Sequence, residues 1–159
     1  MSTLNIGDAA PDFTMPTDGN GEVSLSDFKG QSLILYFYPK DDTPGCTKEA
    51  QGFTEALEEF NGLNAAIIGV SKDSVAKHDK FKAKYDLSFP LASDEESDVC
   101  ERYGAWVEKN MYGKKYMGIE RATFLIDENG KIAEIWRKVK VPGHVDAVKE
   151  ALQDQAKAA

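Results

Sequence analysis

The alternation of strand-like and helix-like segments in the first half of the chain most constrains its fold. Two short apolar runs, Ser32–Pro39 and Ala65–Val70, are each followed by a longer segment in which apolar residues recur at helical spacing. Runs of this length and composition are typical of strands buried on both faces of a sheet. The order strand, helix, strand, helix favours parallel strands joined by right-handed crossovers. The pattern therefore predicts an α/β fold.

The ends of the two helical segments follow from local chemistry. Thr43 and Pro44 form an N-cap and first-turn pair, and the helix that they open is expected to end near Gly62. A second helix is predicted over Ser74–Tyr85, where apolar residues again mark one face. These assignments leave the segment between Pro39 and Thr43 as a loop at the end of the first buried strand.

The second half of the chain is less regular. The elements expected there are an extended piece over Phe89–Ala92, a helix over Ser97–Tyr103, a long loop or irregular hairpin over Trp106–Gly118, an antiparallel hairpin turning at Glu128–Gly130, and a last helix from about Gly143. A hairpin added to parallel strands makes a mixed sheet, with helices on both faces. The residues before Ser32, including EVSLSDF, would be an N-terminal extension on that sheet.

Bulk composition excludes several classes of protein. The 159 residues, 42% of them hydrophobic, predict a single domain over residues 1–159. No run approaches the roughly 20 apolar residues of a membrane span, and the start lacks the features of a targeting segment. The formal charge of −8, from 19 basic and 27 acidic residues, argues against nucleic acid or anionic membranes as partners. With two cysteines, we expect a cytoplasmic protein in a reducing compartment.

Cys46 occupies the position in the chain best suited to reactive chemistry. The segment PKDDTPGCTKE, Pro39–Glu49, places it in the first turn of a helix at the carboxyl end of a buried strand. Unpaired backbone N–H groups and the helix dipole favour a thiolate there. Helical spacing puts Cys46 on the same face as Ala50 and Phe53, so the sulfur should point into a pocket. An isolated Cys is more often an inert buried residue, but these neighbours favour the reactive interpretation.

The residue three positions before Cys46 narrows the reaction. In a disulfide oxidoreductase that position holds the first Cys of Cys-x-x-Cys, whereas here it is Thr43. A hydroxyl at this spacing can reach the sulfur. The replacement argues against disulfide exchange and favours a single thiolate that attacks a non-thiol electrophile.

The segment FYPKDDTPGCTKE resembles the active-site segment of peroxiredoxins, in particular of their bacterioferritin comigratory protein (BCP or PrxQ) branch. The resemblance extends, in the same order, to GDAAPDFTMP, SDFKGQSLILYFYPK and KKYMGIERATFLIDENGKI. It implies a thioredoxin-like fold with the N-terminal extension of peroxiredoxins. It also implies an antioxidant thiol peroxidase that reduces hydrogen peroxide and organic hydroperoxides and is recycled by thioredoxin or another thiol donor.

The resemblance assigns the Pro, Thr, Cys and Arg of peroxiredoxins to Pro39, Thr43, Cys46 and Arg121. It implies that the Cys46 thiolate attacks a peroxide oxygen and becomes a sulfenic acid, while Thr43 and Arg121 hold the peroxide. Without it, an Arg at the start of a strand would be read as a surface charge. Glu49, one helical turn after Cys46, is a candidate for orienting Arg121, and an exposed helix carboxylate is the equal alternative.

The chain departs from the branch where many members carry a second, resolving cysteine. Five residues after Cys46 stands Gln51. The sulfenic acid would then be resolved by Cys100, by another protein such as thioredoxin or glutaredoxin, or by a small thiol such as glutathione. Cys100 lies in SDVCERYG beside apolar neighbours, and a buried structural thiol is its alternative reading.

Other features predict no further chemistry. His78 and His144 are isolated from each other and from the cysteines in sequence, so we expect no metal site and no other cofactor. The basic residues of the Trp106–Gly118 segment are read as a solvated face. A monomer is expected from the branch, with a dimer left open. The alternative functions are a peroxide sensor that signals through oxidised Cys46 and, less favoured, a chaperone or structural role.

Overall fold

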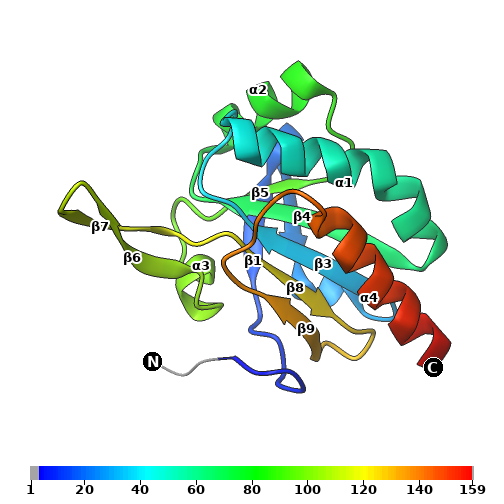
Figure 1. Cartoon of the computed structure of the whole chain (residues 1–159). Coiled ribbons are helices and arrows are strands. Elements are labelled where there is room, and N and C mark those ends of the chain that lie inside the picture. Colours follow the sequence, from blue (N-terminus) through cyan, green and yellow to red (C-terminus); the bar gives the residue numbers. More distant parts are fainter. Residues whose placement is uncertain (1–3, 159) are drawn as a thin grey trace.

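The computed structural model describes residues 4–158, and the side chains of residues 4–155. The strands of its main sheet are β1 (Thr14–Thr17), β2 (Gly21–Ser24), β3 (Ser32–Phe37), β4 (Ala65–Ser71), β5 (Leu91–Ser93), β8 (Ala122–Ile126) and β9 (Ile132–Trp136). Within the described residues these seven strands lie in the order β2-β1-β5-β4-β3-β8-β9 (Figure 1). The α-helices are α1 (Pro44–Gly62), α2 (Val75–Tyr85), α3 (Val99–Arg102) and α4 (His144–Ala158). The predicted α/β architecture with a mixed sheet is confirmed.

Strand β3 is an interior strand of the sheet, between β4 and β8. It pairs in parallel with β4 and antiparallel with β8, so that Leu35 has Ile68 on one side and Phe124 on the other. Every residue of β3 is buried, as expected for an apolar run covered on both faces. The segment that leaves β3 therefore starts from a buried strand that is paired on both sides.

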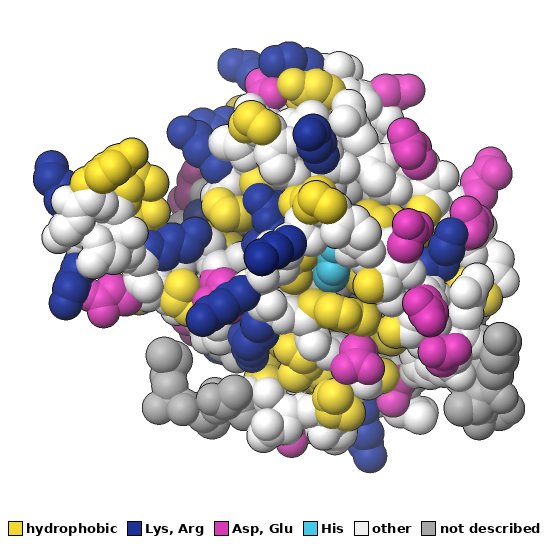
Figure 2. Space-filling model, viewed as in Figure 1, with side chains coloured by type: hydrophobic (Ala, Val, Ile, Leu, Met, Phe, Trp, Pro, Cys, Tyr) yellow, Lys and Arg dark blue, Asp and Glu magenta, His cyan; other side chains and the backbone are white. Residues whose placement is uncertain are grey.

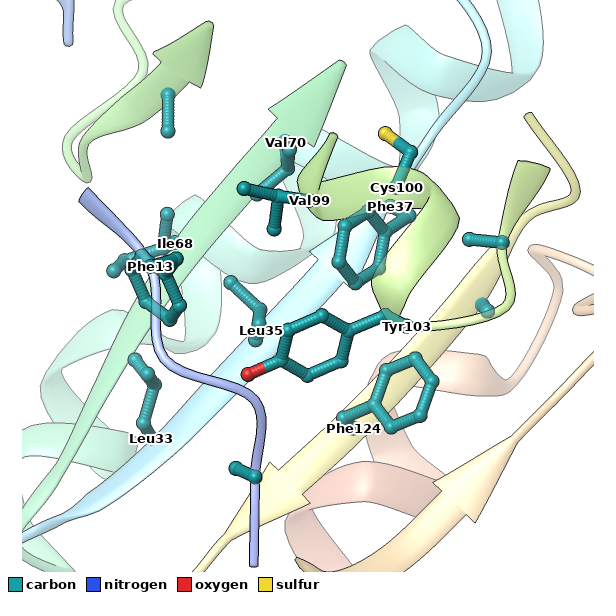
Figure 3. Close-up of a cluster of buried hydrophobic side chains, with 14 of the residues drawn as sticks. Phe13, Leu33, Leu35, Phe37, Ile68, Val70, Val99, Cys100, Tyr103 and Phe124 are labelled. Atoms are coloured by element: carbon teal, nitrogen blue, oxygen red, sulfur yellow. The ribbon is translucent and has the colours of Figure 1, made fainter. Parts of the chain in front are cut away.

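The side chains of β3 alternate between two separate cores. Ile34 and Tyr36 face the core under α1, α2 and α4, which we call the α1-side cluster. Leu35 and Phe37 face the opposite core, which contains the residues of α3 and which we call the α3-side cluster (Figure 3). Helices thus cover both faces of the sheet, as the sequence predicts.

The local signals in the sequence place the helix ends correctly. Thr43 is the N-cap of α1 and Pro44 its first residue, and the helix ends at Gly62. The Ser74 hydroxyl caps α2 by accepting a hydrogen bond from the N–H of Lys77. These ends are predictable because a cap depends on residues within one turn.

The segment Trp106–Gly118 is more regular than predicted. It forms a two-stranded antiparallel hairpin, β6 (Trp106–Met111) and β7 (Lys114–Ile119), that projects from the body of the molecule (Figure 1). Tyr112 and Gly113 make its turn with φ of 53° and 83°, the left-handed geometry of a two-residue hairpin turn. Most of its side chains are exposed or half-buried, so the sequence lacks the alternation of apolar and polar residues that indicates a strand.

The N-terminal extension widens the sheet rather than packing against it. Strand β1 pairs antiparallel with β2 and, through Thr17 and Ala92, with β5. The two added strands cover the edge that β5 would otherwise expose. In the part of the chain that the structure describes, none of the helices combines the length and apolar character that a membrane crossing requires.

Candidate active site

Cys46 lies in the first turn of α1, just after the loop that joins β3 to this helix. Thr43 has an extended backbone, with φ −98° and ψ 156°, and Pro44 begins the helix, so Cys46 occupies the third helical position. The N–H groups of a first turn have no intrahelical partner and present a positive end to nearby anions. The Cys46 side chain is buried, 2% exposed, on the same face as Ala50 and Phe53, as its helical spacing predicts.

Arg121 reaches Cys46 from the neighbouring strand. Because Phe37 pairs with Ala122, the residue just before β8 lies beside the end of β3. Its Nη2 donates a hydrogen bond to Cys46 Sγ at 3.3 Å. Burial alone would lower the pKa of Arg121, but the charges of Glu49 and Cys46 outweigh burial and raise it. A permanent cation therefore touches the sulfur.

The carboxylate of Glu49 also binds the guanidinium of Arg121. Arg121 Nη1 donates to Glu49 Oε1 at 2.6 Å, and the Glu49 side chain has no exposed surface. The alternative of an exposed helix carboxylate is therefore wrong. Burial raises the pKa of Glu49 to about 7 against the opposing effect of Arg121. Its Oε2 and the Tyr36 hydroxyl are both buried without a hydrogen-bond partner among the described residues.

The two remaining predicted site residues lie on the loop before the helix. The Thr43 hydroxyl donates to the Lys40 carbonyl at 2.9 Å, which closes the loop on itself and leaves the Thr43 oxygen able to accept. Pro39 is exposed at the exit from β3. The structure thus brings Cys46, Arg121 and Glu49 together, whereas Thr43 and Pro39 lie on the adjacent loop and their predicted roles stay predictions.

His144, which the sequence showed only as an isolated histidine, lies close to this group. Its Nε2 is 2.8 Å from the hydroxyl oxygen of Thr123, two residues after Arg121, and its ring packs edge-on against Phe53 and Trp136. Burial and then the charge of Arg121 lower the pKa of His144 to about 4. A neutral imidazole is therefore built in next to the guanidinium. The loop between β9 and α4 brings it there, and sequence spacing carries no signal of that approach.

The charges on this face of the molecule are unevenly distributed. Figure 2 shows Lys and Arg side chains gathered toward the end where α1 begins, and Asp and Glu side chains gathered where α1 ends and along α4. The formal charge of −8 thus hides a more basic region near the start of the helix. Such a field favours an anion at the first turn of α1.

Cys100 is in a different setting. It is fully buried on α3 in the α3-side cluster, whereas Cys46 belongs to the α1-side cluster on the other face of the sheet (Figure 3). Its N–H donates to Asp94 Oδ2 at 2.8 Å. Burial and then the negative charge of Asp94 raise the pKa of the Cys100 thiol far above its ordinary range. The possible resolving role stays a prediction, and the placement favours the structural alternative.

Known proteins are similar to this chain in sequence. Residues 6–135 match the sequence model of the AhpC/TSA family. A putative peroxiredoxin bcp of Coxiella burnetii is 56% identical over 146 residues, which cover 92% of this chain and 97% of the relative. Peroxiredoxin Bcp of Bacillus subtilis is 50% identical over 154 residues, with 97% and 98% covered.

Solved structures of peroxiredoxins are similar to this chain in fold. Peroxiredoxin Q of Xanthomonas campestris superposes with a TM-score of 0.89 at 46% identity, over 96% of this chain and 97% of that one. A PrxQ mutant of Xylella fastidiosa superposes with a TM-score of 0.93 at 43% identity, over 98% and 99%. The predicted thioredoxin-like fold is thereby confirmed. The chain belongs to the AhpC/TSA family and, within it, to the Bcp/PrxQ branch of the peroxiredoxins, which makes it a thiol peroxidase.

Proposed function

We propose that Cys46 is the peroxide-reducing nucleophile of this peroxidase and that its substrates are hydrogen peroxide and organic hydroperoxides. The contact of Arg121 Nη2 with Cys46 Sγ, at 3.3 Å in the first turn of α1, carries the proposal. A cation and a helix start together favour the thiolate that the reaction needs. A solved structure of the Xanthomonas campestris bacterioferritin comigratory protein, 45% identical, is described through that protein's alkyl peroxide reduction activity, which supports the substrate class.

The proposed step is a displacement on oxygen. The Cys46 thiolate attacks one oxygen of the peroxide, the O–O bond breaks, and the departing oxygen takes up a proton to leave as water or an alcohol. Cys46 is oxidised to a sulfenic acid and the peroxide is reduced. Arg121 and the N–H groups of the first turn stabilise the charge that develops on the departing oxygen. Thr43 offers a hydroxyl oxygen that accepts the proton end of the peroxide.

The proposed recycling uses a thiol from outside the chain. Gln51 stands where many relatives in the branch have a cysteine, and Cys100 lies in the core on the other face of the sheet. An external thiol, from thioredoxin, glutaredoxin or glutathione, would condense with the sulfenic acid to a mixed disulfide and release water. A second thiol then breaks that disulfide and returns Cys46 to the reduced state.

Intact mass spectrometry tests the proposal directly. The reduced protein receives one equivalent of hydrogen peroxide, beside Cys46→Ser and Cys100→Ser controls. Gain of one oxygen by the unsubstituted protein and by Cys100→Ser, but not by Cys46→Ser, is the expected result. Loss of two hydrogens that requires both cysteines would show internal resolution by Cys100, and an unchanged mass would overturn the role of Cys46.

The same samples separate an enzyme from a sensor. After addition of thioredoxin, thioredoxin reductase and NADPH, an enzyme consumes peroxide continuously. A sensor takes one equivalent and stops. We expect continuous consumption with at least one of the thioredoxin, glutaredoxin or glutathione systems.

A further inference from the structure

A buried polar network lies beneath the loop that carries the active-site residues. Asp41, two residues before Thr43, is buried, and its Oδ2 lies 2.7 Å from Nδ1 of His78 on α2. The other carboxylate oxygen accepts a hydrogen bond from the Tyr38 hydroxyl at 2.5 Å. The backbone N–H of Asp41 donates to Asp73 Oδ2 at 2.8 Å. The loop is thus tied to β3, to α2 and to the end of β4 by one residue.

His78 is fixed at both ends of its ring. Its Nε2 is 3.0 Å from the carbonyl oxygen of Ala92 in β5, and its side chain is completely buried. The Ala92 carbonyl oxygen faces one ring nitrogen and a carboxyl oxygen of Asp41 faces the other, while the Tyr38 hydroxyl lies 3.5 Å from Nδ1. The contact of Asp41 with His78 is therefore a buried polar pair within a hydrogen-bonded network. Removing one partner alone leaves the other buried without its hydrogen bond, which destabilises the folded protein.

We infer that Asp41 and His78 are positioning residues for Cys46, which hold the active-site loop closed for the reaction with peroxide and whose contact must break before a bulky thiol can reach the oxidised sulfur. The inference rests on the proposed function. Cys46 is 2% exposed, so the closed loop leaves too little of it accessible for a reagent larger than a small peroxide. A disulfide needs sulfur-to-sulfur contact at about 2 Å, and the sulfur of another protein cannot approach that closely while the loop is closed.

The buried pair is placed to control this opening. The loop between β3 and α1 begins at the buried Tyr38, whose N–H donates to the Val70 carbonyl, and beyond it the described side chains attach the loop through the buried Asp41 and the exposed Asp42. The exposed attachment joins Asp42 Oδ2 to Lys84 Nζ at 2.9 Å and Asp42 Oδ1 to the Tyr85 hydroxyl at 2.7 Å. Solvent screens an exposed pair, which contributes little, whereas the buried pair must be broken in a poorly solvated place. The buried pair therefore sets how often the loop opens.

A positioning role predicts opposite changes in the two half-reactions. Weakening the buried pair displaces the Cys46 thiolate from Arg121 more often, so oxidation by peroxide slows. The same opening exposes the sulfenic acid, so its reduction by a bulky thiol accelerates. General damage to the fold would not speed up a chemical step at the active site.

The experiment measures both half-reactions in Asp41→Asn, His78→Gln and the double variant. Stopped-flow oxidation by hydrogen peroxide gives the first rate, and reduction of the peroxide-oxidised protein by reduced thioredoxin gives the second. We expect oxidation to fall and reduction to rise, each by roughly tenfold. The double variant should do no more than either single variant, because both remove the same contact.

Matched controls come from the exposed attachment of the same loop. Asp42→Asn keeps a residue that tolerates the φ of 60° at this position, and Lys84→Gln removes its partner. Both should leave the two rates within about twofold. Tyr38→Phe removes one hydrogen bond to Asp41 but keeps the ring in the core. It should move both rates in the directions of Asp41→Asn by roughly threefold, and it provides the test if the charge variants fail to fold.

Two results would overturn the inference. One is a parallel fall of both rates in the Asp41, His78 and Tyr38 variants, and the other is an effect of the Asp42 and Lys84 variants as large as theirs. Hydrogen exchange of the reduced protein separates this failure from failure of the proposed function, because it involves no peroxide. Faster exchange over residues 41–47 in His78→Gln, with the remaining helices unchanged, would support the loop attachment even if Cys46 did not react with peroxide.

Discussion

Cys46 and Cys100 are almost equally hidden from solvent, at 2% and 0% exposed, yet their electrostatic surroundings differ. Arg121 donates a hydrogen bond to the sulfur of Cys46, and Glu49 holds the guanidinium in place. Asp94 faces Cys100, and its charge adds to the effect of burial in raising the pKa of that thiol. One thiolate is compensated by a neighbouring cation, and the other would have to form beside an anion.

The difference teaches that burial alone does not decide whether a cysteine is reactive. Removal from water penalises both thiolates, and only a compensating cation and the start of a helix offset that penalty. The contrast extends to the buried carboxylate beside each thiol. Glu49 binds Arg121 and keeps one oxygen without a partner among the described residues, whereas Asp94 accepts hydrogen bonds from the N–H groups of Val99 and Cys100.

Removing the cation should have the largest effect. Arg121→Met keeps most of the side-chain volume but deletes the charge and both hydrogen bonds. We expect the rate of Cys46 oxidation by hydrogen peroxide to fall by about 100- to 1,000-fold in stopped-flow measurements.

Arg121→Lys provides the matched control. It keeps the charge but lacks the planar fork that contacts Cys46 and Glu49 together, so it should recover only part of the lost rate. A Met variant as fast as the unsubstituted protein would show that the helix start alone sustains the thiolate.

Titration of His144 should affect stability rather than rate. Its pKa in the folded protein is about 4, below its ordinary value of 6.5, so the unfolded chain binds the proton more tightly. The stability that follows from this difference is fully present above pH 6.5 and is lost as the pH falls through about 4. The loss should be on the order of 2 kcal/mol, discounted for relaxation around the charged ring.

Urea unfolding from pH 7 to pH 4 measures this effect. Other groups also titrate in that range, so the useful quantity is the difference between the unsubstituted protein and His144→Gln, which cannot titrate. The difference should shrink or change sign toward pH 4. A constant difference across the range would show that His144 is not held neutral beside Arg121.

The fold was predictable where its determinants are local. Pro44 suits the first position of α1 and follows the extended Thr43, so the start of the helix is marked by adjacent residues. The run Ser32–Phe37 is buried on both faces, so its apolar character is continuous. The segment Trp106–Gly118 was predicted only as a long loop or irregular hairpin, because few of its side chains are buried, which removes the period-two pattern of a regular hairpin.

The residues of the site also differ in whether local sequence could predict them. Helical spacing from Cys46 placed Glu49 one turn away, but Arg121 reaches the sulfur through strand pairing, and only the family resemblance pointed to it. The contact of Asp41 with His78 joins a loop to a different helix and was not predicted. One signal was present, since His78 lies three residues from Phe81 and therefore on the buried face of α2.

The protonation state of Glu49 should produce a smaller and pH-dependent effect on rate. Burial raises its pKa to about 7, so its charge, and with it the hold on Arg121, is lost as the pH falls through that value. Glu49→Gln mimics the protonated form at every pH. We expect the unsubstituted protein to be oxidised about tenfold faster than Glu49→Gln at pH 8.5 and at nearly the same rate at pH 5.5.

The ratio of the two rates is informative because the ionisation of Cys46 affects the oxidation rate of both proteins, and this effect largely cancels in the ratio. Stopped-flow oxidation across this range provides the ratio. A ratio above one that is the same at both ends of the range would show that Glu49 stays ionised throughout, and a ratio of one at both ends would show that its charge does not affect the rate.

Cys100→Ala should have the smallest effect and is the sharpest test of the comparison. The substitution removes one buried sulfur atom from the α3-side cluster, so the free energy of unfolding should fall by about 1 kcal/mol. The rates of Cys46 oxidation and of turnover with an external thiol should stay within about twofold, because Cys100 lies across the sheet beside Asp94. Slower turnover with unchanged oxidation would mean that Cys100 reaches the sulfenic acid during the cycle. The two cysteines would then be separated only in the resting protein, and an opening much larger than release of the loop at Asp41 would be required.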